Sequence, residues 1–303
     1  GFEPKIEGNW SNKNIHSVVT KYCKCQSKPL CHYNKFIEKY NPGKLESYFN
    51  NDLFVYANVP YKIKSYPDLL KNPKDTIDFD LDLDTKINNK RKELGADGAL
   101  LRDENFFICK VNFIEKILAT VLAKVSNFIP EAGIWLNTQR PEWNDANNAL
   151  VGNGVSVVTL NHLRRFLKFF ENVIDESAIE NVNISEELLS FYNSVTNTLL
   201  THEGLLKGKI SDDDRKTILD GLGMAGSNYR STIYKQAYSG HKARIEIKNL
   251  KLFITTTLKY LEHTIDANRR EDGLYHAYNL MTVKGKSEIS IDYLEEMLEG
   301  QVA

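Results

Sequence analysis

Three long segments of the chain repeat apolar side chains at intervals of three and four residues, the spacing of one face of an α-helix. These segments cover residues 110–128, 155–174 and 245–265. In the first of them the stripe consists of Ile114, Ile117, Leu118, Val121, Leu122 and Val125. The pattern predicts that long amphipathic helices form most of the core.

Shorter helices are predicted over residues 14–23, 32–40, 185–206, 212–223, 227–238 and 292–298. Ser211 followed by three aspartates is a typical helix start, because carboxylates favour the positive end of the helix dipole. Strand signals are sparse, and the best are the short segments 106–111 and 133–136. We therefore expect an all-α fold of packed helical hairpins, either an (α/α) toroid or an irregular bundle, with long functional loops.

The charges of the chain are nearly balanced, with 39 basic and 40 acidic side chains. No long Lys/Arg stripe is present, so we expect no nucleic-acid partner. The cluster Lys90-Arg91-Lys92, with Lys86 one turn earlier, is interpreted as the solvated end of a helix. No apolar stretch approaches the roughly 20 residues of a membrane-spanning helix, so no membrane partner is expected either.

The cysteines and histidines do not suggest a metal site. The cysteines are Cys23, Cys25, Cys31 and Cys109. Their spacing does not fit paired zinc ligands, and no two histidines have a metalloprotease spacing. Free thiols favour a reducing compartment such as the cytoplasm, whereas glycosylation sequons at Asn9 and Asn183 leave a periplasmic or secreted location open.

Both ends of the chain suggest a piece of a longer protein. Gly1 is not a natural start, and the last residues end without a cap or polar tail. We interpret residues 1–303 as one helical, catalytic-type domain whose partner is the rest of the parent chain.

The densest group of polar side chains lies in residues 137–148, between two of the amphipathic segments. Trp143 can stack on a pyranose ring, and an Asp145 desolvated beside it would stay protonated as a general acid. Arg140 can hold an anion. Amide side chains that match sugar hydroxyls are Asn144, Asn147 and Asn148. The alternative interpretation is an Asn-rich helix cap around a buried Trp.

The 15 residues of segment 143–157 resemble the catalytic loop of the cellobiose phosphorylase family. The resemblance rests on Trp143-Asn144-Asp145, Asn148, Gly152, Gly154 and Ser156-Val157. It implies an (α/α)6 toroid, Asp145 as the general acid, and sugar subsites lined by Trp143 and Asn144. It also implies that inorganic phosphate attacks the anomeric carbon with inversion.

Two departures from the family pattern limit what the resemblance implies. Pro141-Glu142 and Ala146 replace the family's Gly-Asp before the Trp and its Gly after the Asp. The family's phosphate-binding positions have no match in the chain. Water therefore stays open as the nucleophile, which would make the enzyme an inverting hydrolase.

A second polar segment begins at Glu271-Asp272-Gly273 and is predicted to line the other side of a sugar cleft. Its expected sugar-binding residues are Tyr275, His276, Tyr278 and Asn279. An inverting hydrolase also needs a base, for which the options are Glu142, Asp97, Glu271 and Asp272. We take Glu142 and Asp272 as the catalytic candidates beside Asp145. The alternative is a type I turn at 271–273 that leads into a packed hairpin.

Together these observations predict a carbohydrate-active enzyme domain that cleaves glycosidic bonds in an oligosaccharide or polysaccharide. Asp145 is the expected acid, inorganic phosphate is a possible co-substrate, and no cofactor or metal is expected. The alternative function is a catalytically silent helical domain that binds glycans or supports a larger enzyme.

Overall fold

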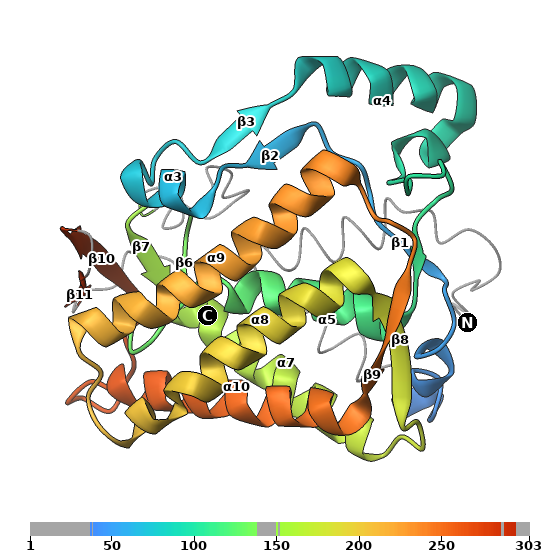
Figure 1. Cartoon of the computed structure of the whole chain (residues 1–303). Helices are drawn as coiled ribbons and strands as arrows, with labels where there is room; N and C mark the ends of the chain where they lie inside the picture. The colour runs from blue at the N-terminus through green and yellow to red at the C-terminus, as the bar shows by residue number, and fades with distance from the viewer. Residues whose placement is uncertain (1–36, 38, 138–149, 151, 286–287, 295–303) are drawn as a thin grey trace, which may run out of the picture.

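The computed structural model describes residues 37, 39–137, 150, 152–285 and 288–294, and they form a mixed α/β fold (Figure 1). The helices are α3 (Tyr66–Lys71), α4 (Leu81–Leu94), α5 (Phe113–Val125), α7 (Val157–Asp175), α8 (Glu186–His202), α9 (Asp212–Gln236) and α10 (Ile247–Ala267). The 3₁₀ helices are η1 (Glu46–Tyr48), η2 (Gly95–Ala99) and η3 (Glu203–Lys207). None of the helices in the described part of the chain is long and apolar enough to cross a membrane.

The strands form one five-stranded antiparallel sheet and three two-stranded ribbons. The sheet has the order β11-β10-β7-β6-β5. Its strands are β5 (Phe128–Ile129), β6 (Gly133–Trp135), β7 (Gly154–Ser156), β10 (Tyr278–Lys284) and β11 (Glu288–Tyr293). The ribbons pair β1 (Phe54–Val55) with β4 (Lys110–Val111), β2 (Tyr61–Ile63) with β3 (Ile77–Phe79), and β8 (Asn181–Ser185) with β9 (Lys242–Glu246).

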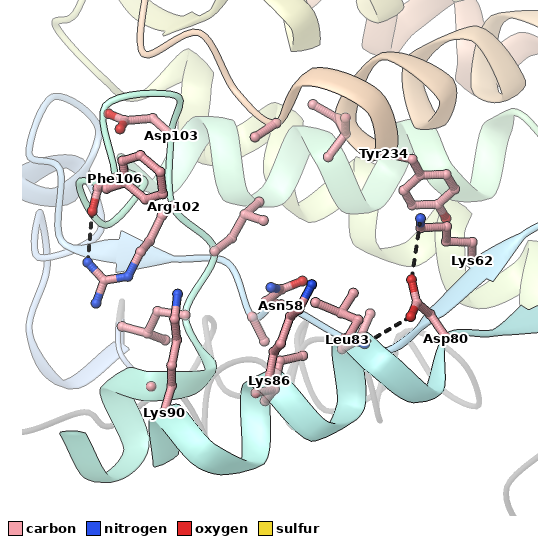
Figure 2. Close-up of a pocket in the computed structure, with 18 of the residues that line it drawn as sticks. Asn58, Lys62, Asp80, Leu83, Lys86, Lys90, Arg102, Asp103, Phe106 and Tyr234 are labelled. Carbon is pink, nitrogen blue, oxygen red and sulfur yellow. Dashed lines mark hydrogen bonds and ion pairs between the residues drawn. The ribbon is translucent and has the colours of Figure 1, made fainter. Parts of the chain in front are cut away.

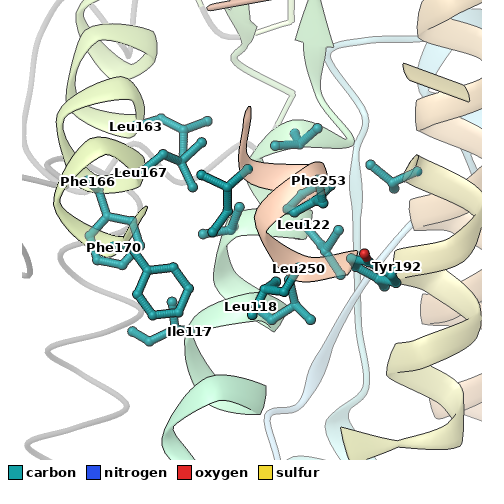
Figure 3. Packing of buried hydrophobic residues seen from close by; sticks show 14 of the residues in the cluster. Ile117, Leu118, Leu122, Leu163, Phe166, Leu167, Phe170, Tyr192, Leu250 and Phe253 are labelled. Atoms are coloured by element: carbon teal, nitrogen blue, oxygen red, sulfur yellow. The ribbon is translucent and has the colours of Figure 1, made fainter. Parts of the chain in front are cut away.

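The main hydrophobic core lies among α5, α7, α8 and α10, and Figure 3 shows how it packs. The apolar stripe of α5 supplies Leu118 and Leu122, while Leu250 and Phe253 come from α10. All four side chains are almost fully buried. The three long helices predicted from apolar spacing are therefore confirmed, with ends that differ by a few residues.

A second, smaller core lies beneath the five-stranded sheet. It includes Ile129, Trp135, Val155 and Met281 from the strands, together with Leu219 from α9. In Figure 1, strands β6, β7, β10 and β11 lie at one end of the helices and the β8–β9 ribbon at the other. This ribbon leads directly into helices, since α8 starts one residue after β8 and α10 one residue after β9.

The prediction of an all-α toroid, and with it of an entirely helical domain, is wrong. Most of the strands were missed because they are short, and β7, β8 and β9 run directly into helices without a Gly/Pro boundary. β11 was partly assigned to a helix over 292–298, whereas Asp292 and Tyr293 pair with β10. The predicted strand over 106–111 reaches only Lys110–Val111, while the strand over 133–136 is confirmed as β6.

Two predicted helices, 212–223 and 227–238, are one continuous helix, α9. Its start is confirmed, because the Ser211 hydroxyl accepts a hydrogen bond from the Asp214 amide at 3.1 Å. Glycines in the middle of α9 allow close packing of its neighbours. A Cβ on Gly223 would meet the ring of Tyr66 at 2.4 Å, so α3 approaches α9 where a larger residue would not fit.

Gly133 is essential to the turn that leads into β6, so Gly133→Ala is expected to lower the free energy of unfolding by about 2–4 kcal/mol. The residue has a φ of +132°, and a Cβ would lie 2.8 Å from the backbone oxygen of Ser156 in β7. Urea denaturation measures the loss. Gly208→Ala is the matched control, because nothing lies within 4 Å of a Cβ there. Equal stability of the two variants would contradict this role of Gly133.

Candidate functional site

The segment with the predicted catalytic residues connects two adjacent strands of the sheet, β6 and β7. The base of this β6–β7 hairpin is tied by backbone hydrogen bonds from Leu136 N to Gly154 O (2.9 Å) and from Gly152 N to Leu136 O (2.8 Å). The buried indole of Trp135 donates to the same turn, at 2.7 Å from Gly152 O. The ends of the segment are therefore fixed by both backbone and side-chain bonds.

Seven predicted site residues lie outside the described residues. They are Arg140, Glu142, Trp143, Asn144, Asp145, Asn147 and Asn148. Their proposed roles stay predictions from the sequence.

The second predicted segment lies directly beside the hairpin. β10 pairs antiparallel with β7, with Tyr278 opposite Ser156 and Leu280 opposite Gly154. The Met281 amide also donates to Asn153 O at 2.8 Å. Residues far apart in sequence thus lie on neighbouring strands in the interior of the sheet. Asn153, near the end of the connection, lies beside Met281, whereas Tyr275 and His276 precede the opposite end of β10, where Ala277 O accepts from Val157 N.

Asp272 lies in a tight turn between α10 and β10. Its carboxylate accepts a hydrogen bond from the Leu274 amide at 3.0 Å and lies 2.8 Å from the guanidinium of Arg270. The turn is closed by a bond from Gly273 N to Arg270 O, and Gly273 has a φ of +81°. The described contacts of Asp272 are those of a turn residue. Of the other carboxylates considered, Glu271 lies in the same turn and Asp97 lies in η2 beside α4.

The four predicted sugar-binding residues of this segment differ in their exposure. Tyr275 is 43% exposed and His276 is half-buried, with its Nδ1 2.8 Å from Leu294 O. Tyr278 is buried. Asn279 has no exposed surface and donates to Ala132 O at 2.8 Å, so it holds the β5–β6 turn in place. Only Tyr275 and His276 are open to a ligand.

A buried ion pair next to this sheet was not predicted from the sequence. Glu131 and Arg215 are each at least 95% buried and lie 2.7 Å apart. The Arg215 guanidinium also donates to Pro130 O (3.0 Å) and Ile289 O (2.9 Å). His263 lies 3.3 Å from the other carboxylate oxygen of Glu131. The pair therefore joins the start of α9 to the β5–β6 turn and to β11.

Glu131 also has an unusual backbone conformation, with a φ of +61°. Such a conformation costs about 1–2 kcal/mol in a residue with a side chain. The single sequence signal was the Pro130-Glu131-Ala132-Gly133 turn, which gives no indication that Arg215 is its partner.

Cys109, the one cysteine among the described residues, is a buried free thiol. Burial raises the pKa of this thiol to about 12. The thiol is therefore neutral at physiological pH and is a poor nucleophile. Within the described part of the chain, no group of three His, Cys, Asp or Glu side chains is arranged to hold a metal ion.

A small cavity of about 200 Å³ lies against the hairpin base and β10. Its walls include Trp135, Asn153 and Met281, together with Leu69 and Pro73 from the α3 region. Typical small-molecule sites occupy roughly 300–1,000 Å³. The cavity formed here by the described residues is therefore smaller than a typical small-molecule site.

Comparison with protein-family models finds none that matches the chain, and comparison with curated proteins finds no similar sequence. The resemblance of segment 143–157 to the cellobiose phosphorylase family therefore rests on its own residues.

Proposed function

We propose that this chain is part of a carbohydrate-active enzyme that cleaves glycosidic bonds with inversion, with Asp145 as the general acid. The main support is the run Trp143-Asn144-Asp145 with its following glycines. The run belongs to a connection whose ends are tied to β6 and β7, beside the strand that follows Tyr275 and His276.

In this proposal, protonated Asp145 gives its proton to the leaving glycosidic oxygen. Phosphate or water attacks the anomeric carbon from the opposite face. Phosphate is already a nucleophile, whereas water needs a base about 6.5–9.5 Å from the acid. Glu142 is the base we favour, because Asp272 is engaged by Leu274 and Arg270. Trp143, Asn144, Asn147 and Asn148 would bind the sugar, and Arg140 the anion.

The alternative is a catalytically silent domain that binds glycans or supports a larger enzyme. It is favoured by the mixed α/β fold, which departs from the toroid that the resemblance implied. A glycan-binding domain needs only Trp143, the amides and the exposed Tyr275. It does not need a protonated Asp145.

Product release from α- and β-linked oligosaccharides, with and without phosphate, tests the proposal on the longest available parent chain. We expect turnover of at least one substrate. Release of a sugar phosphate only when phosphate is present would identify a phosphorylase, and phosphate-independent release would identify a hydrolase. Glycan binding without any turnover would contradict the proposal and support the silent domain.

We propose that the protein works in a reducing compartment, the cytoplasm. Cys109 is a free thiol, and the cysteine spacing does not fit zinc ligands, so the cysteines are interpreted as free thiols, which are typical of such a compartment. The periplasm and the cell exterior are the alternatives. Glycosylation at Asn183, which lies in β8, would contradict a cytoplasmic location. Mass spectrometry of the native protein tests for it.

A further inference from the structure

A larger cavity in the described part of the chain lies between α4 and the end of α9. Its volume is about 750 Å³, within the range of small-molecule sites. It is enclosed by α4, η2, the loop 100–106, the segment 57–62 and the end of α9 (Figure 2). None of the described lining residues comes from β6, β7 or β10. The described lining thus differs from the strands that hold the ends of the segment proposed for glycosidic chemistry.

Three cationic side chains, Lys86, Lys90 and Arg102, line this cavity. Lys86 and Lys90 are one helical turn apart on α4; Figure 2 shows Lys90 extending toward the loop that carries Arg102 and Lys86 extending toward Asn58. Neither lysine has an ion pair or hydrogen bond within the described residues. Arg102 donates one bond, from Nη1 to Phe106 O at 2.8 Å, which leaves its other N–H groups for a ligand.

The nearby carboxylates do not neutralise these three cations. Asp80 accepts a bond from the Leu83 amide (2.9 Å) and lies 3.8 Å from Lys62. One oxygen of Asp103 accepts two backbone hydrogen bonds at 2.9 Å in the loop. Asp82 is in the exposed first turn of α4, and Lys235 adds a further cation at the end of α9. The described lining has five basic and three acidic side chains, so the cavity has an excess of positive charge.

Phe106 forms part of the rim above Arg102 (Figure 2). Its side chain is 76% exposed, so the fold gains little apolar burial from it. Its φ is +65°, a conformation that is rare for a bulky residue. The loop holds it there through a bond from Phe106 N to Asp103 O at 3.0 Å and through Arg102. Strained backbone conformations cluster at ligand-binding sites, and Phe106 combines such a conformation with an exposed aromatic ring beside Arg102.

We propose that this cavity binds a phosphate ester of a ring-bearing small molecule. The phosphate would lie on Lys86, Lys90 and Arg102, and the ring would stack on Phe106. A phosphate dianion matches three cations better than a single carboxylate does, and the guanidinium fork fits two phosphate oxygens. An exposed aromatic face binds a nucleobase or the apolar face of a sugar. This inference does not depend on the proposed glycosidic activity.

Isothermal titration with AMP, glucose 6-phosphate, inorganic phosphate and glucose tests the proposal on the full chain. We expect at least one ester to bind more tightly than inorganic phosphate, and glucose without phosphate to be much weaker at this site. The double variant Lys86→Glu with Lys90→Glu should weaken ester binding by at least about tenfold. Lys92→Glu, on the same helix but outside the cavity lining, should change it little.

A second pair of variants tests the ring contact. Phe106→Ala should weaken the ester by about three- to tenfold and leave inorganic phosphate unchanged. Phe107→Ala is the matched control, because Phe107 is 71% exposed but does not line the cavity. The proposal is overturned if no ester binds at millimolar concentration. Equal weakening by Lys92→Glu and the double variant, or by Phe107→Ala and Phe106→Ala, would also overturn it.

Discussion

Replacing Arg215 with Met is expected to lower the free energy of unfolding by about 3–5 kcal/mol, as is typical for breaking a buried ion pair. The substitution keeps most of the side-chain volume but leaves the carboxylate of Glu131 buried without its cation. It also leaves Pro130 O and Ile289 O without their donor. Urea denaturation at neutral pH measures the loss.

Two further variants show whether the loss comes from an unpaired buried charge. Asp212 also contacts Arg215, but it is 40% exposed, so Asp212→Asn should cost less than about 1 kcal/mol. Combining Arg215→Met with Glu131→Gln should restore part of the stability, because no isolated charge is then buried. A loss below about 1 kcal/mol in Arg215→Met, or a double variant that is less stable still, would contradict this account.

Asp145→Asn is expected to lower the turnover of an oligosaccharide by about 10²–10⁴-fold, the usual contribution of a general acid. The amide keeps the size and polarity of the side chain but cannot give a proton to the leaving oxygen. Substrate affinity should change much less than the rate. Initial rates across substrate concentrations separate the two effects.

Asp213→Asn is the control for this variant. Asp213 is exposed in the first turn of α9, so the same chemical change there should leave turnover intact. If Asp145→Asn keeps the parent's rate, Asp145 is not the acid. The Asn-rich cap would then be the better interpretation of segment 137–148.

The long helices could be predicted because their apolar stripes report burial directly. Leu118 and Leu122 were identified by spacing alone, and both are in the core. The helix start at Ser211 was also predictable, since a cap depends on a few neighbouring residues.

The sheet could not be predicted in the same way, because strand pairing depends on residues distant in sequence. β7 consists of only three residues, Gly154–Ser156, and α7 starts at the next residue. A strand this short is too brief to show a detectable alternation of apolar and polar side chains. It becomes a strand because β6 and β10 pair with it on both sides. The expected α/α architecture was therefore wrong even though the helices themselves were placed well.

The sites show the same division between local and distant information. The sequence located the polar segment 137–148 and the segment after α10, but it could not show that β7 and β10 pair. The Glu131–Arg215 pair joins residues 84 positions apart, so neither one stands out alone. The lysines of α4 were interpreted as a solvated helix end. Both Lys86 and Lys90 are exposed, as that interpretation requires. They also line a cavity whose other walls come from η2 and from the end of α9, which is distant in sequence.

The most direct test of the central proposal compares Asp145→Asn with the parent on two glycosides that differ only in their leaving group. A general acid matters greatly for an alkoxide or sugar leaving group and little for a dinitrophenolate, which leaves without a proton. We predict that the variant loses about 10²–10⁴-fold on the oligosaccharide and nearly nothing on the dinitrophenyl glycoside. Equal losses on both substrates would show that Asp145 acts in some other way, and the absence of turnover by the parent on either substrate would contradict the enzymatic proposal itself.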